Sequence, residues 1–337
     1  AGFFGKVARY LAPESHWLFK ARAVVKRLMR EHRIDAVITS SPPGCVHWLG
    51  LWLAKRGLPW LADFRDPWIV NQSFARQTLH LRYERWLEAK VMRRATRLIA
   101  NTPLNQRGWE AAYPDSADKM AVITNGFDPE RFPAQPPHVV GDPLTMLHAG
   151  ELYHGRDPRP LLDALQSLKN ENRNPITVDF LGRTSGLAFD LPGEIAQRGL
   201  GDIVKTPGMV PYAEALDRMM RADILLLVHT PGWRIGVPAK LYEYLGAGRP
   251  ILAVAEPDSD IGWVLRESKV LHRIAPPLDS AAIRQALVEL VDDVRAGRPT
   301  APDGEAVQQF TRASMAQRFA ECLDHCVRMP ASATVPT

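Results

Sequence analysis

The chain contains little cysteine, no long apolar run and little net charge. Its 337 residues include three cysteines, Cys45, Cys322 and Cys326, too few for a disulfide framework and typical of a reducing compartment. The longest apolar stretch, residues 46–54, is far shorter than the ~20 residues needed to span a bilayer. No signal peptide is visible. These absences exclude a disulfide-rich secreted domain and a membrane-spanning helix, and they predict a cytoplasmic protein.

Metal ligands are also sparse. Cys322, His325 and Cys326 fall together on a predicted helix, but no second cluster of ligands elsewhere completes a zinc site. We therefore expect no metal site, and the three side chains are interpreted as a chance cluster.

The net charge of +5 hides an uneven distribution. Residues 1–135 carry 21 Lys/Arg and 12 Asp/Glu, whereas residues 136–337 carry 21 and 25. This asymmetry points to an anionic partner of the front half, nucleic acid or an anionic membrane surface, although plain solvated helices would look the same. The basic residues lack interleaved aromatic stacking positions, which disfavours nucleic acid. The expected membrane contacts, on the inner face, are Lys26, Arg27, Arg30, Arg82, Arg85, Arg93 and Arg94.

Apolar runs of strand length alternate with amphipathic helical segments. Strands are predicted at residues 34–39, 59–64, 97–101, 120–124, 144–149, 177–181, 203–205, 223–228, 250–254 and 270–274. Such alternation is typical of α/β proteins with parallel sheets. At roughly 150 residues per domain, the length predicts two Rossmann-like, doubly wound domains facing across a cleft. They cover residues 1–134 and 135–310, with a Pro-rich linker at 133–137, a helix at 311–328 and a disordered tail at 329–337.

A first candidate site lies at residues 236–250, where a glycine turn leads into a predicted helix. A helix N-terminus exposes backbone N–H groups and suits an anion. Lys240 lies in the first turn, where a cation is unfavourable unless an anion is also bound. Glu243 shares its helix face and suits the two hydroxyls of a ribose, although the two residues could equally form an ordinary surface pair. Backbone donors are expected from Gly236, Val237, Pro238 and Ala239.

A second candidate follows the predicted strand 144–149, where open α/β sheets hold phosphate groups. Gly150, Glu151 and Gly155 form the turn, and Arg156 could clamp a diphosphate through two hydrogen bonds. The glycine spacing is not a dinucleotide fingerprint, so a plain turn remains the alternative.

In the front half, charged residues follow the predicted strand 59–64. Asp63, Arg65 and Asp66 end that strand, where ionisable groups are costly unless they are paired or used. The loop after the preceding strand should face the same cleft, and its Ser40, Ser41 and Pro42 suit substrate contact or a simple turn.

The order of these motifs resembles family 4 glycosyltransferases with the GT-B fold, in particular the bacterial polysaccharide branch. The resemblance rests on Asn125–Phe132, Gly150–Leu162, Ala222–Leu227 and Lys240–Tyr244 with Ala247–Pro250. It implies a retaining transferase that moves a sugar from a nucleotide-diphosphate donor on the second domain to a glycan, lipid-linked or small-molecule acceptor on the first. It also implies that no metal or other cofactor is needed, because basic side chains neutralise the leaving diphosphate.

The resemblance assigns roles to the candidate residues. Arg156 and Lys240 would hold the diphosphate and Glu243 the ribose, while Asp63, Arg65 and Asp66 would line the acceptor side. The final helix would pack on the first domain. The family's first strand and its glycine-rich loop would precede Ala1, so an N-terminally truncated first domain is expected.

Two departures from the family pattern keep alternatives open. Ile235 stands where members commonly carry a glutamate that contacts the donor sugar, and Arg65 replaces a histidine found in many members. A nucleotide-sugar 2-epimerase uses the same two-domain architecture. A degenerate nucleotide-sugar-binding module without catalysis is the third interpretation.

Overall fold

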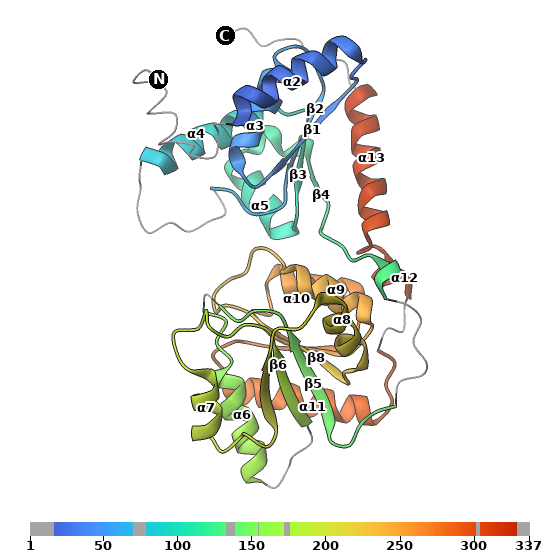
Figure 1. Cartoon of the computed structure of the whole chain (residues 1–337). Coiled ribbons are helices and arrows are strands. Elements are labelled where there is room, and N and C mark those ends of the chain that lie inside the picture. The colour runs from blue at the N-terminus through green and yellow to red at the C-terminus, as the bar shows by residue number, and fades with distance from the viewer. Residues whose placement is uncertain are drawn as a thin grey trace. The chain divides into compact units, whose positions relative to one another are not determined.

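The computed structural model of this chain describes residues 17–69, 79–132, 139–153, 155–171, 176–300 and 304–328. The chain forms two compact units, residues 1–125 with 315–337, and residues 126–314. The predicted linker at 133–137 and the predicted tail at 329–337 lie outside the described residues. Both units are α/β with wholly parallel sheets, which confirms the predicted fold class (Figure 1).

The first unit is built on a four-stranded sheet of order β1-β2-β3-β4. Its strands are β1 (Val37–Ser41), β2 (Trp60–Phe64), β3 (Arg97–Ala100) and β4 (Met120–Val122). Its helices are α2 (Leu18–Glu31), α3 (His47–Ala54), α4 (Leu79–Arg94), α5 (Pro103–Ala112) and α13 (Arg312–Arg328). α2 has no buried residue, in contrast to α3, α4 and α5.

Helix α13 returns to the first unit from the far end of the chain. Its Cys326 is fully buried against Leu61, Ile99 and Ile123 of the sheet region, and Cys322 packs beside it. Burial raises the pKa of the Cys326 thiol to about 11. Burial also raises the pKa of the Cys322 thiol, so both cysteines serve as packing residues of α13.

The second unit has a six-stranded sheet of order β10-β9-β8-β5-β6-β7. Its strands are β5 (Leu144–Ala149), β6 (Ile176–Leu181), β7 (Val204–Gly208), β8 (Ile224–Val228), β9 (Ile251–Val254) and β10 (His272–Ala275). Its helices are α6 (Arg159–Asn170), α7 (Leu191–Gln197), α8 (Tyr212–Arg221), α9 (Ala239–Ala247), α10 (Asp260–Ser268), α11 (Ser280–Arg295) and α12 (Gly304–Gln308).

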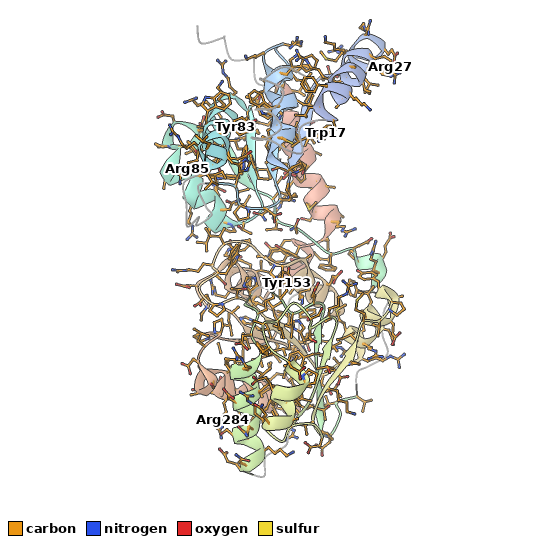
Figure 2. All side chains as sticks on the ribbon, turned by 60° about the vertical axis from the view of Figure 1, so that its left-hand side comes forward. Trp17, Arg27, Tyr83, Arg85, Tyr153 and Arg284 are labelled. Carbon is orange, nitrogen blue, oxygen red and sulfur yellow. The ribbon has the colours of Figure 1, made fainter. Side chains whose placement is uncertain are left out.

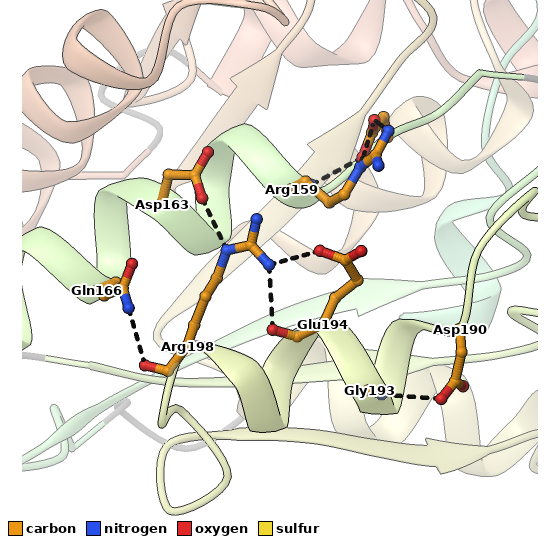
Figure 3. Close-up of polar contacts among 8 residues, drawn as sticks. Arg159, Asp163, Gln166, Asp190, Gly193, Glu194 and Arg198 are labelled. Atoms are coloured by element: carbon orange, nitrogen blue, oxygen red, sulfur yellow. Dashed lines mark hydrogen bonds and ion pairs between the residues drawn. The ribbon is translucent and has the colours of Figure 1, made fainter.

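Two apolar clusters fill this unit, one on each face of the sheet. The first joins alternate sheet residues to α6, α7 and α11, and the second joins the other residues to α8, α9, α10 and α12. Polar links add to this packing: Arg198, just after α7, donates to Asp163 of α6 at 2.7 Å and to Glu194 at 2.5 Å (Figure 3).

Most predicted strands match the structure within a few residues, and the largest shift is at β1. The predicted strand 34–39 begins only at Val37, whose N–H donates to the Pro59 carbonyl. Asp35 instead accepts a 2.9 Å hydrogen bond from Arg33, and both residues are largely exposed. Pairing with β2 therefore starts three residues later than predicted.

Candidate functional site

The second unit gathers the predicted donor residues where its strand order reverses. β5 is the first strand of this sheet, β6 follows on one side of it, and β8 lies on its other side. Ligands of open α/β sheets bind at such a switch point, outside the carboxyl ends of the strands. The loops after β5 and β8 and the start of α9 meet here and carry Arg156, His229 and Lys240 respectively.

Lys240 is half-buried in the first turn of α9. Pro238 caps the helix with extended backbone, so Ala239 and Lys240 begin it. The Lys240 Nζ lies 3.0 Å from Nε2 of His148, the fully buried penultimate residue of β5. Burial, and next the nearby Arg156, lower the pKa of Lys240 to about 7.

Arg156 stands in the same electrostatic neighbourhood. Its guanidinium lies over the Tyr153 ring, 4.3 Å from the centroid. Burial lowers the pKa of His229 to about 4, and the charge of Arg156 adds to this shift. Burial also holds the pKa of His148 well below its usual value, with a further contribution from Arg156. Both histidines are therefore neutral at pH 7, and the cluster carries its charge on Arg156 and Lys240.

These two cations lie without a paired carboxylate among the described residues. Across the described ranges, neither Arg156 nor Lys240 forms an ion pair with Asp or Glu. Nδ1 of His229, 6% exposed, has no hydrogen-bond partner among the described residues. A partly buried cation without a paired counter-ion is unfavourable, so this corner of the sheet suits a bound anion with several acceptor oxygens.

Glu243 does not pair with Lys240, contrary to the ordinary surface pair that was the alternative interpretation. Its Oε1 accepts a 2.7 Å hydrogen bond from the hydroxyl of Tyr212, the first residue of α8. The Arg131 guanidinium lies over the Tyr212 ring at 5.6 Å and contacts Asp128. The carboxylate is thus held from α8 and keeps acceptor capacity for a ligand's hydroxyls.

The predicted backbone donors before α9 need correction. The Gly236 N–H already donates to Oδ2 of the fully buried Asp260 at 2.8 Å, and Pro238 has no N–H to offer. Gly236 instead serves the turn, with φ of 96°. Val237 is partly buried against the apolar cluster of α8–α10. Packing of the Val237 side chain leaves its backbone N–H available, so Val237 and Ala239 are the remaining donors of the predicted segment.

The glycines after β5 shape the loop. Gly150 has φ of 108°, and a Cβ there would lie 2.9 Å from the Lys240 Nζ. Gly155 has φ of 79°, and a Cβ there would approach Thr230 at 3.2 Å. Glu151 is exposed. Gly150 thus leaves the space that the lysine ammonium occupies.

In the first unit, the predicted acceptor residues meet at the carboxyl ends of β1 and β2. Ser40 pairs in register with Asp63, and its hydroxyl donates to Oδ2 of that residue at 2.6 Å. Burial raises the pKa of Asp63, while Arg65, whose Nε lies 3.2 Å from Oδ1, and the Ser40 hydrogen bond oppose the rise. Pro42 and Asp66 are exposed nearby.

Arg65 is used within its own unit. Its guanidinium donates to the carbonyls of Ile123 and Thr124, just past β4, and lies over the Phe319 ring of α13 at 5.8 Å. The pairing of Arg65 with one carboxylate, the simpler alternative, is therefore what the structure contains. Its predicted acceptor role stays a prediction.

A buried hydrogen-bond chain supports this edge and was not expected. Trp60 Nε1 donates to Thr39 Oγ1 at 2.7 Å, and this hydroxyl donates to His47 Nδ1 at 2.8 Å. Nε2 of His47 then donates to Ser41 Oγ at 3.0 Å, which donates to the Asp63 carbonyl at 3.4 Å. The directions follow from the Ser41 end, because its hydroxyl donates to a carbonyl and must accept from Nε2 of His47, and the neutral ring then accepts at Nδ1. Ser41 is buried and occupied by this chain, so the expectation that it contacts an acceptor is not supported.

In the part of the chain that the structure describes, no group of three His, Cys, Asp or Glu side chains is placed to hold a metal ion. No described helix is long and apolar enough to cross a membrane. The metal-free expectation remains a prediction.

Comparison with known proteins relates part of the chain to a glycosyltransferase family. Residues 4–131 match the model of Glycosyltransferase Family 4. This match covers 128 of the 337 residues. The chain is 27% identical over 183 residues to D-inositol 3-phosphate glycosyltransferase of Streptomyces scabiei, and 26% over 164 residues to the probable glycosyltransferase WbjE of Pseudomonas aeruginosa. These matches cover 50% and 48% of the chain, but 40% of either relative.

Solved structures share the fold of this chain. HepE of Anabaena, solved with UDP, aligns with a TM-score of 0.68 at 20% identity over 90% of the chain and 82% of HepE. HepE has also been solved with UDP-glucose. The two parallel-sheet units are those of the GT-B fold.

Proposed function

We propose that the protein transfers a sugar from a nucleotide-diphosphate donor, bound by the second unit, to an acceptor bound by the first. The observation that carries this proposal is the pair Arg156 and Lys240, two cations without a carboxylate partner among the described residues, at the switch point of the sheet. Because the leaving diphosphate gains negative charge in the transition state, fixed cations there lower the barrier. UDP-sugars are the first donors to test, since HepE was solved with UDP.

The remaining residues have roles consistent with this chemistry. Glu243, held by Tyr212, would accept the ribose hydroxyls. Asp63, buried beside Ser40 and Arg65, would sit on the acceptor side. The transfer would retain the anomeric configuration. The acceptor would be a glycan, a lipid-linked molecule or a small molecule in glycoconjugate synthesis.

The test is turnover. The full chain would be incubated with UDP-, GDP- and ADP-sugars and a panel of acceptors, with nucleotide release as the readout and product anomers read by NMR. Acceptor-dependent release with a retained anomer supports the proposal. Conversion of the donor without any acceptor would indicate the 2-epimerase alternative, and binding without turnover the degenerate module.

We further propose that the basic front half rests on an anionic membrane surface, from the cytoplasmic side. The seven predicted contact cations are all exposed, and Figure 2 places Arg27 on α2 and Arg85 on α4. α2 also exposes Phe19 at 79% and Val24 at 46%. A helix with apolar and basic side chains and no buried residue suits the plane of a lipid surface. Binding to vesicles with phosphatidylserine should weaken as salt rises. Salt-independent binding, or none, would refute this proposal.

A further inference from the structure

The fully buried His148 has polar contacts with strand β8 and with helix α9, besides a contact with the Gly150 backbone. Its Nδ1 lies 3.0 Å from the carbonyl oxygen of Leu226 in β8, and its Nε2 lies 3.0 Å from the Lys240 Nζ. Its ring packs against Phe180 with 5.9 Å between centroids. This residue of β5 therefore connects the central strands of the sheet to the first turn of α9.

The proton on the imidazole can be assigned from its neighbours. A carbonyl oxygen only accepts, so Nδ1 of His148 carries the proton and donates it to Leu226. Nε2 then has a free lone pair and accepts a hydrogen bond from the Lys240 ammonium. Burial, followed by the charge of Lys240, keeps the pKa of His148 well below its usual value, so the ring stays neutral.

The anchor of His148 is itself fixed. The Leu226 carbonyl also accepts a hydrogen bond from the Tyr244 hydroxyl at 3.0 Å, and this hydroxyl accepts from the Ala149 N–H at 2.9 Å. Tyr244 lies on α9, one turn beyond Lys240. Strand β5, strand β8 and helix α9 thus share one hydrogen-bonded unit around the imidazole.

Room for the ammonium comes from Gly150. Its backbone has φ of 108°, and a Cβ would lie 2.9 Å from Nζ and 3.2 Å from Cε of Lys240. The ammonium thus lies between an imidazole acceptor and a glycine backbone. The other charged or titratable groups that act on it are Arg156, which lowers its pKa, and Glu243, which raises it; His229 lies in the same field.

A neutral acceptor has a different consequence from a carboxylate. A carboxylate at 3.0 Å would hold the ammonium but also cancel its charge, and an incoming diphosphate would have to compete with it. An imidazole acceptor restricts the direction of the lysine and leaves its positive charge available to an anion.

We propose that His148 is a positioning residue that aims Lys240 at the donor diphosphate through a neutral hydrogen bond, in a space that Gly150 provides. This inference rests on the proposed nucleotide-sugar function. It adds a residue that would touch neither the donor nor the acceptor.

Two polar substitutions separate positioning from packing. In His148→Gln the amide group reaches the place of Nε2 and can accept from Lys240. In His148→Asn the amide lies near Nδ1, so it keeps the bond to Leu226 and loses Lys240. UDP affinity of the full chain would be measured by calorimetry from pH 6.5 to 9, with thermal unfolding recorded for each variant.

We expect His148→Gln to bind UDP within about threefold of wild type and His148→Asn about tenfold more weakly. Without an acceptor at position 148, the Lys240 ammonium is less stable and loses its proton at lower pH. The decline of UDP affinity with rising pH should therefore occur about one pH unit lower in His148→Asn than in wild type. Binding by His148→Asn that equals or exceeds that of His148→Gln, or identical pH profiles, would overturn the positioning role. Failure of wild type to bind UDP, GDP or ADP would instead overturn the proposed function.

Discussion

The hydroxyl of Tyr212 donates a 2.7 Å hydrogen bond to Oε1 of Glu243. A single residue of α8 thus orients the carboxylate on α9 that the proposed function assigns to the ribose. Tyr212 is 47% exposed, so this contact is accessible to solvent and to ligand.

Replacing Tyr212 by Phe should therefore weaken nucleotide binding without affecting the diphosphate contacts. One hydrogen bond at a partly exposed site contributes about 0.5–1.5 kcal/mol, so UDP affinity should fall about two- to tenfold. Affinity for inorganic pyrophosphate, which lacks a ribose, should stay within about twofold. Equal losses for UDP and pyrophosphate in calorimetric titrations would contradict this division of roles.

Nucleotide binding should take up a proton near neutral pH. Lys240 has a pKa lowered to about 7 by burial and by Arg156, and a bound diphosphate would raise that pKa again. UDP affinity should therefore fall as pH rises from 7 to 9, by up to about tenfold per unit, in a range where the phosphate groups of UDP no longer titrate. Calorimetry in buffers of different ionisation enthalpy would measure the uptake, and Lys240→Met should abolish it. Uptake that persists in Lys240→Met would assign the proton to another group.

The sequence predicted the fold and the position of Lys240, but not the contacts around it. Apolar strands alternating with helices indicate parallel sheets, and a glycine turn with Pro238 places Lys240 in a first helical turn. Residues 148 and 240 meet only because β8 pairs directly with β5, and that pairing cannot be read from a local pattern. A histidine inside an otherwise apolar strand run was the available signal.

The first unit shows the same limit. Thr39, Ser41 and Trp60 look like ordinary strand residues, yet the tertiary fold closes them around His47 in one hydrogen-bonded chain. Conversely, Gly236 looked like a free backbone donor because the sequence does not reveal that Asp260 would reach it.

Gly150→Ala should act through Lys240. A methyl group at this position would contact the ammonium at 2.9 Å, so UDP affinity should fall about tenfold in the wild-type background. In a Lys240→Met background the same glycine change should cost clearly less affinity, since coupled residues are non-additive, and the remaining loss would measure the strain of a Cβ at φ of 108°. Additive losses across this double-mutant cycle would show that Gly150 acts on the nucleotide by another route.

His47 should make the first unit less stable in acid. Burial lowers its pKa to about 3 in the folded state, against 6.5 as the ordinary value, so the unfolded chain binds more protons between these two pH values. The contribution of His47 to stability is therefore complete above pH 6.5 and declines as pH falls toward 3. When urea unfolding is followed by tryptophan fluorescence, the free energy of unfolding of His47→Leu should fall less between pH 7.5 and pH 5 than that of wild type. An unchanged loss would mean that other groups control the acid sensitivity.

Calorimetric titration of UDP into the full chain, its Lys240→Met and Arg156→Met variants, and matched controls tests the central claim most directly. The controls are Lys205→Met, an exposed lysine of β7, and Arg221→Met, an exposed arginine of α8. Loss of one buried charge-assisted contact is expected to cost about 1.5–3 kcal/mol, so either site variant should bind UDP at least tenfold more weakly while both controls match wild type. Binding by the site variants that equals that of the controls would contradict the assignment of a diphosphate site to Arg156 and Lys240.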